Sequence, residues 1–234
     1  MNIAVIYGTE HKGSTYNITQ LFLNKLKAEN SSVTEFFLPK DMPMFCRGCS
    51  ICFMKSEKFC PDFNEINRIK ECMEKADLLI FSSPVYVYHT TGQMKTLLDH
   101  FGYQWMVHRP NKTMFNKMAL VISTAAGAGM KSTNKDICDS LFFWGVGRIF
   151  KYGKGVAAIN WQGVSQKTKL KIYDDIEKIS EKILKASKNN SPSIKVKGLF
   201  YLMRFVQKRG GFNPTDHEYW KSQGWLEQTK PWRA

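Results

Sequence analysis

Hydrophobic residues along the first 188 positions occur in two alternating patterns. Short continuous apolar runs rich in β-branched residues predict buried strands, while apolar residues three or four positions apart predict amphipathic helices. The predicted strands are 2–8, 32–38, 76–86, 117–124 and one within 153–160. The predicted helices are 14–30, 64–75, 92–102, 131–144 and 165–188. This alternation favours an α/β fold in which helices cover both faces of a five-stranded parallel sheet.

The pattern changes after the sequence "NNSPS" at 189–193. Residues 195–209 have one basic and one apolar side, and Trp220, Trp225 and Trp232 follow in an aromatic tail. Because so many large apolar side chains are rarely left in water, we expect the tail to dock, in a homodimer. We therefore divide the chain into a domain of residues 1–190 and a C-terminal extension of residues 191–234.

The composition and the cysteine count indicate the cellular compartment in which the protein works. The 234 residues are 43% hydrophobic, and the longest apolar runs, such as "LFYLM" at 199–203, are far shorter than a membrane span. The start "MNIAVIYGTE" lacks the basic region of a signal peptide. Six cysteines, four of them crowded together, do not form the pattern of a secreted disulfide framework, so we expect a reducing, cytoplasmic setting.

The net charge of +14 comes from lysines and arginines scattered along the chain rather than from a block of like charges. A general attraction of small anions accounts for this distribution, and we expect no nucleic-acid partner.

Three loops that leave predicted strands have unusual compositions. The first, 8–17, offers the hydroxyls of Thr9, Ser14 and Thr15 at a helix N-terminus, which suits a phosphate. Ser14 and Thr15 could equally cap that helix. The loop 82–95 combines proline with aromatic residues and suits a flat heteroaromatic ring. The loop 123–129 consists of small residues that allow close approach of a ligand.

The segments "GTEHKGSTYNIT", "CRGCSIC" and "ADLLIFSSPVYVYHTTGQMKTLLDH" resemble the flavodoxin-like NAD(P)H-dependent FMN reductase family, over roughly residues 1–187. The resemblance implies a flavodoxin-like three-layer sandwich that binds FMN and passes electrons from NAD(P)H to an acceptor. It places the FMN phosphate against Thr9, Gly13, Ser14, Thr15 and Asn17. It places the isoalloxazine ring against Pro84, Val85, Tyr86 and Val87, with Ala125, Ala126, Gly127 and Gly129 at the other edge.

Four cysteines, Cys46, Cys49, Cys52 and Cys60, form the spacing C-x2-C-x2-C-x7-C ahead of a proline. Two-residue gaps let thiolates turn inward around one cluster, and Gly48 eases the turn between the first two. The motif resembles that of the iron–sulfur flavoproteins, which implies a [4Fe–4S] cluster near FMN. Three other interpretations stay open: a loop without a cofactor, a zinc site, and a dithiol of Cys46 and Cys49.

The sequence therefore predicts an FMN-dependent oxidoreductase that uses NAD(P)H and reduces a quinone, a flavin or another small acceptor. The alternative is an iron–sulfur flavoprotein that exchanges electrons with a redox protein, and a third interpretation is a flavin-responsive binding protein without turnover. His89 is a candidate at the flavin edge, and His100, Trp105 and His108 could line an acceptor pocket or pack in the core. For residues 195–209, packing on a partner subunit or over the flavin is preferred to a membrane surface.

Overall fold

The computed structural model describes residues 1–42 and 44–233. Five parallel strands form one sheet in the order β2-β1-β3-β4-β5. They are β1 (Ile3–Tyr7), β2 (Val33–Phe37), β3 (Leu78–Pro84), β4 (Met118–Ala125) and β5 (Arg148–Gly155). The strand order reverses between β1 and β3, and this is the point at which open parallel sheets bind ligands. The predicted flavodoxin-like sheet is confirmed.

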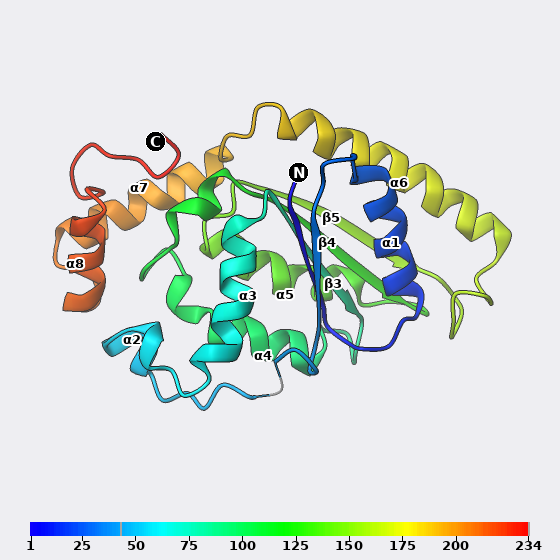
Figure 1. Ribbon diagram of the computed structural model, residues 1–234, viewed down its shortest axis with the longest axis horizontal. Helices are drawn as coiled ribbons and strands as arrows, with labels where there is room; N and C mark the ends of the chain where they lie inside the picture. Colours follow the sequence, from blue (N-terminus) through cyan, green and yellow to red (C-terminus); the bar gives the residue numbers. More distant parts are fainter. Residues whose placement is uncertain (43, 234) are drawn as a thin grey trace.

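Helices cover both faces of the sheet (Figure 1). One face packs against α1 (Ser14–Leu26) and α6 (Gln166–Ser187). The other packs against α3 (Phe63–Lys75), α4 (Gly92–His100) and α5 (Met130–Phe143). Successive strand residues face opposite sides, so Ile3 and Val5 belong to the first core and Ala4 and Ile6 to the second. Both faces are buried, which explains why the central strands are continuous apolar runs.

The prediction for the last strand is wrong in its position. A strand within 153–160 was expected, but β5 covers Arg148–Gly155, and the apolar run from Val156 to Ile159 lies in the loop that follows. Because β5 is an edge strand with a single neighbour, it tolerates Arg148, Lys151 and Lys154 among its apolar residues. These charges hide the strand from a search for apolar runs.

The connection between β2 and α3 contains two short elements that the pattern did not predict. These are α2 (Ile51–Met54), inside the cysteine motif, and the 3-10 turn η1 (Glu57–Phe59). Two further 3-10 turns, η2 (Gly102–Gln104) and η3 (Lys112–Asn116), lead from α4 to β4.

The C-terminal extension forms α7 (Ile194–Lys208) and α8 (Pro214–Ser222). The two helices lie at one end of the molecule, with α2 below α8 in the view of Figure 1. Phe200, Trp220 and Trp225 are buried against Met106 and Phe115 of the α/β domain. The prediction that the aromatic tail docks is confirmed, but it docks on its own chain. The homodimer stays a prediction.

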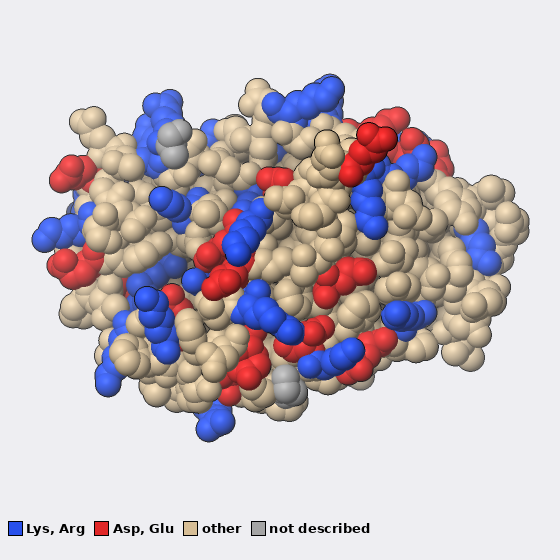
Figure 2. Space-filling model, in the orientation of Figure 1, with Lys and Arg blue, Asp and Glu red and all other residues tan. Residues whose placement is uncertain are grey.

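Two further observations concern the charges on the surface and the helices. Lys and Arg side chains are interspersed with Asp and Glu over the face shown in Figure 2. Within residues 1–42 and 44–233, no helix is both long and apolar enough to cross a membrane.

Candidate functional site

A cavity of about 250 Å³ opens at the carboxyl ends of the strands, where the loops after β1, β3 and β4 converge. Its walls come from these three loops and from the segment that follows β5. The lining residues are Thr9, His11, Gly13, Ser14, Thr15, Pro84, Val85, Tyr86, Thr124, Ala125, Ala126, Val156, Ala158 and Ile159.

At one end of this cavity lies the N-terminus of α1. The N-cap residue is Gly13, which supplies no side-chain capping bond, and the first turn contains no acidic residue. Ser14 is only 8% exposed, and its hydroxyl has no hydrogen-bond partner among the described residues. Ser14 and Thr15 therefore do not cap the helix. An unpartnered buried hydroxyl beside the positive end of a helix dipole fits a phosphate.

Neighbouring side chains stabilise the backbone at this end of the cavity. Thr15 Oγ1 shares a hydrogen bond of 2.6 Å with Thr124 Oγ1, which ties α1 to the end of β4. Thr9 Oγ1 accepts a hydrogen bond from the His11 backbone N–H at 3.2 Å. Asn17 donates from Nδ2 to the Gly13 carbonyl at 2.8 Å, so its side chain stabilises the loop and does not line the cavity.

The loop after β3 makes a tight two-residue turn beside the cavity. Tyr86 and His89 exchange backbone hydrogen bonds of 2.9 and 3.0 Å. Between them, Val87 and Tyr88 adopt the left-handed conformation, with φ of 47° and 67°. Bulky residues rarely adopt this conformation, and backbone strain of this kind concentrates at ligand sites. Val87 stands at the tip and is 94% exposed.

Nine of the thirteen residues predicted for the cofactor lie together around the cavity, and Asn17, Val87, Gly127 and Gly129 do not line it. Sequence reasoning missed His11, Thr124 and the wall formed by Val156, Ala158 and Ile159. The sequence carries a signal for this wall, because residues 156–159 form an apolar run, but that run predicts part of a strand and not a wall of the site.

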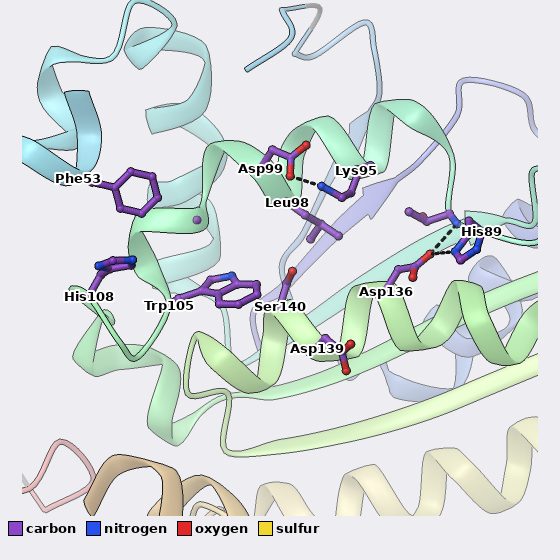
Figure 3. Close-up of a pocket in the computed structure, with 12 residues that line it drawn as sticks. Phe53, His89, Lys95, Leu98, Asp99, Trp105, His108, Asp136, Asp139 and Ser140 are labelled. Carbon is purple, nitrogen blue, oxygen red and sulfur yellow. Dashed lines mark hydrogen bonds and ion pairs between the residues drawn. The ribbon is translucent and has the colours of Figure 1, made fainter. Parts of the chain in front are cut away.

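A larger cavity, of about 720 Å³, lies between α4 and α5 and extends to Phe53 of α2 (Figure 3). Two pairs form within its lining: Lys95 with Asp99, and His89 Nδ1 with Asp136 Oδ2 at 3.0 Å. His89 therefore turns toward α5, and its side chain does not line the cavity at the strand ends. Since Ser14, whose buried hydroxyl has no partner among the described residues, lines the smaller cavity, we place the candidate cofactor site there.

The four cysteines of the motif are free thiols, and Cys46, Cys49 and Cys60 lie near enough to Cys52 to influence its pKa. Partial burial and, to a smaller extent, the nearby thiols of Cys60, Cys46 and Cys49 together raise the pKa of Cys52 to about 11. Burial also raises the pKa of Cys60. Gly48 has a φ of +64°, as predicted for a tight turn between the first two cysteines. Four thiols on one loop match the donor type of an iron–sulfur cluster, although among residues 1–42 and 44–233 no three of them form a group within 4.8 Å.

Two polar residues lie beneath this loop. One ligand atom each of Cys60, Asp62 and His100 lies within 4.8 Å of the others. His100 is buried, with Nε2 3.2 Å from Asp62 Oδ2 and Nδ1 2.9 Å from the Thr96 carbonyl. Sequence reasoning did not identify Asp62. His100 does not line the larger cavity, whereas Trp105 and His108 do.

Comparisons with curated proteins find iron–sulfur flavoproteins. An iron–sulfur flavoprotein from Archaeoglobus fulgidus is 24% identical over 231 residues, which cover 97% of this chain and 100% of that one. Four shorter archaeal matches carry the same name.

Solved structures show the fold. An azoreductase from Bacillus anthracis str. Sterne has a TM-score of 0.61 at 13% identity, covering 78% of this chain and 99% of its own. An FMN-dependent NADH-azoreductase from Bacillus anthracis str. Ames Ancestor, solved with FMN, has a TM-score of 0.55 at 12% identity, covering 77% of this chain and 100% of its own. Residues 1–158 match the family model of NADPH-dependent FMN reductases. The chain thus belongs to the NADPH-dependent FMN reductase family and is an oxidoreductase.

Proposed function

We propose that the protein is an FMN-dependent oxidoreductase that transfers electrons from NAD(P)H to a quinone, a flavin or another small acceptor. The observation on which this rests is the cavity at the strand ends, with the buried, unpartnered Ser14 hydroxyl beside the uncapped N-terminus of α1. Membership in the FMN reductase family supports the same cofactor.

In this proposal the N-terminus of α1 and the Ser14 hydroxyl hold the phosphate. Pro84, Val85 and Tyr86 border one edge of the ring, and Ala125 and Ala126 border another. When bound, FMN supplies the hydride and electron chemistry. The polypeptide supplies position: the Thr15–Thr124 hydrogen bond fixes α1 against β4, and the turn at Val87 and Tyr88 fixes the loop after β3. His89, paired with Asp136, does not act on the flavin in this proposal.

A second candidate function is that of an iron–sulfur flavoprotein, an electron carrier in which Cys46, Cys49, Cys52 and Cys60 hold a [4Fe–4S] cluster. It is supported by the position of Cys46, Cys49 and Cys60 around Cys52 on one loop and by the names of the curated relatives. Such a cluster supplies single-electron transfer, which suits a redox protein as partner. We propose in addition that the protein is a cytoplasmic homodimer, and the six free thiols fit a reducing compartment.

The two candidates differ in their metal content. We would measure flavin, iron and acid-labile sulfide per chain on protein purified without oxygen, and compare turnover with NAD(P)H and with reduced ferredoxin. About one flavin with about four irons and four sulfides would support the carrier. One flavin without iron, together with NAD(P)H oxidation, would support the simple reductase. Absence of flavin even after FMN is added would contradict both.

Two cysteine variants test whether the motif binds the metal. Cys52→Ser should abolish iron incorporation if the loop binds a cluster. Cys72→Ser is the matched control, because Cys72 is a partly buried thiol of α3 outside the motif. Equal iron content in the two variants would place the metal elsewhere.

A further inference from the structure

The segment around α7 carries charges of one sign only. Residues 182–215 contain eight lysines and arginines and no aspartate or glutamate, in a chain whose net charge is +14. Among residues 1–42 and 44–233, none of the eight forms an ion pair with a carboxylate. The eight are Lys182, Lys185, Lys188, Lys195, Lys197, Arg204, Lys208 and Arg209. Uncompensated charge of this density calls for an anionic partner.

The face of α7 that points away from the protein is apolar. Val196, Phe200 and Met203 occupy the docked side of the helix and are buried. At 3.6 residues per turn, Ile194, Tyr201, Leu202 and Phe205 fall on the opposite side. These four are all exposed, Ile194 by 89%, Leu202 by 55% and Phe205 by 51%. A helix that is apolar on both sides covers more hydrophobic surface than its own domain uses.

Cations border this apolar ridge. The Arg209 guanidinium lies 3.8 Å from the centre of the Phe205 ring, and Lys230 lies 6.0 Å from that of Tyr201. Lys195 and Lys208 are exposed on the same helix. Phe212, beyond the end of the helix, is exposed as well. The helix has 15 residues, so the ridge is about 22 Å long. The helix α7 lies at one end of the molecule in Figure 1.

We propose that the outer face of α7 binds the surface of a membrane that contains anionic lipids. In this arrangement Leu202 and Phe205 enter the boundary between headgroups and acyl chains, and the flanking lysines and arginines contact lipid phosphates. Amphipathic helices of this composition lie in the plane of the interface and do not span the bilayer.

Two other occupants fit less well. A second copy of this chain, packed symmetrically on the same face, would bring the two unpaired sets of cations together. A folded acidic protein would need a groove complementary to a convex ridge, whereas a lipid surface accepts such a ridge without matching shape.

The test is flotation of the FMN-loaded full chain with lipid vesicles. Vesicles of phosphatidylcholine with about 30% phosphatidylglycerol should bind the protein, and pure phosphatidylcholine should bind it about tenfold less, because the lysines and arginines near the surface contribute to binding. Raising the salt to about 0.5 M should release the protein, because the charges become screened.

Two double variants separate the charge from the apolar ridge. Leu202→Gln with Phe205→Gln, and Lys208→Glu with Arg209→Glu, should each lower binding to the anionic vesicles about tenfold. The matched controls lie on α6: Leu170→Gln, at a leucine that is 59% exposed, and Lys167→Glu with Lys171→Glu. These controls should bind like the original chain. Because every substituted side chain is exposed, FMN content should stay constant in all variants.

A third readout reports insertion directly. Phe205→Trp should give blue-shifted fluorescence, quenched by brominated acyl chains, only with anionic vesicles. The proposal is overturned if the α6 and α7 variants bind alike, or if the original chain binds no vesicles. It is also overturned if sedimentation shows a dimer that the Leu202→Gln/Phe205→Gln variant dissociates, since the face would then join two copies.

Discussion

The Arg109 guanidinium donates a hydrogen bond of 2.8 Å to Asp216 Oδ1, and both side chains are buried. The same guanidinium donates to the backbone carbonyls of Phe53, at 3.1 Å, and of Cys52. Asp216 lies in α8, and Cys52 lies in α2 within the cysteine motif. The ion pair thus joins the C-terminal extension to the loop that holds the four thiols. Thr215 reinforces the connection by donating to the Met54 carbonyl at 3.1 Å.

Asp216→Asn should destabilise the protein and loosen the cysteine loop. The substitution leaves the Arg109 charge buried without a counterion, a change that typically costs about 3–5 kcal/mol. Urea unfolding measures this loss. The matched control is Asp139→Asn, which removes an exposed partner of Lys135 and should cost less than about 1 kcal/mol.

A local measurement tests whether the cysteine loop loosens in the Asp216→Asn variant. In metal-free protein below the unfolding transition, Cys52 should react with iodoacetamide faster in the Asp216→Asn variant than in the original chain. Cys138 in α5, a partly buried thiol outside the motif, should react at an unchanged rate. A loss of stability with no change at Cys52 would mean that the ion pair does not position the loop.

Ser14→Ala should weaken FMN binding without affecting the free protein. The Ser14 hydroxyl has no partner among the described residues, so its removal breaks no internal bond. A hydrogen bond to a charged phosphate contributes about 1.5–3 kcal/mol, which corresponds to a dissociation constant at least about tenfold higher. Fluorescence titration of apoprotein with FMN measures this constant.

Thr19→Ala is the matched control for Ser14→Ala. Thr19 is a buried hydroxyl in α1 that bonds to the Thr15 carbonyl and to Ser82, away from the cavity lining. Its loss should lower stability by about 1 kcal/mol and change FMN affinity little. If the two variants bound FMN equally, Ser14 would not face the phosphate.

Gly129→Ala should disturb the loop after β3, whereas Gly127→Ala should not. Gly129 has a φ of +100°, and a Cβ there would lie 2.6 Å from Val85 Cγ1 and 3.1 Å from Tyr88 Cα. A Cβ on Gly127 would meet nothing within 4 Å. We expect about 1–3 kcal/mol lost stability and weaker FMN binding for Gly129→Ala alone. Thermal unfolding of both apoproteins measures this, and equal melting temperatures would show that the loop adapts.

Much of the sheet could be predicted because β1, β3 and β4 are buried on both faces and therefore read as continuous apolar runs. The edge strand β5 could not, since Arg148, Lys151 and Lys154 interrupt its apolar residues. The cavity was predicted through loops that leave central strands, where the chain order determines which ends meet. His11 and Thr124 were missed because their roles depend on how side chains converge across the sheet.

The position of the C-terminal extension also could not be predicted from the sequence pattern. The three tryptophans predicted burial, but not the surface that would receive them. Trp220 and Trp225 pack on Phe115 and Met106, which come from segments about 100 residues earlier. The same distance in sequence separates Arg109 from Asp216. Contacts of this range follow from the three-dimensional arrangement and leave no local periodicity to detect.

The alkylation of Cys52 should depend on pH in a way that reports its burial. In metal-free folded protein, burial first and the neighbouring thiols second raise the pKa of Cys52 from 9.0 to about 11. Only the thiolate reacts, so at pH 8 the folded protein should react about a hundredfold more slowly than the same chain in urea. Since the folded pKa is the higher one, the protonated thiol favours folding below pH 9, and this contribution is lost between pH 9 and about 11. Cys46→Ser with Cys49→Ser should leave most of the difference in place, because burial is the larger cause. Identical pH profiles in folded and unfolded chains would show that Cys52 is as exposed to water as a free thiol, and the loop would then lack the enclosed position that a cluster ligand needs.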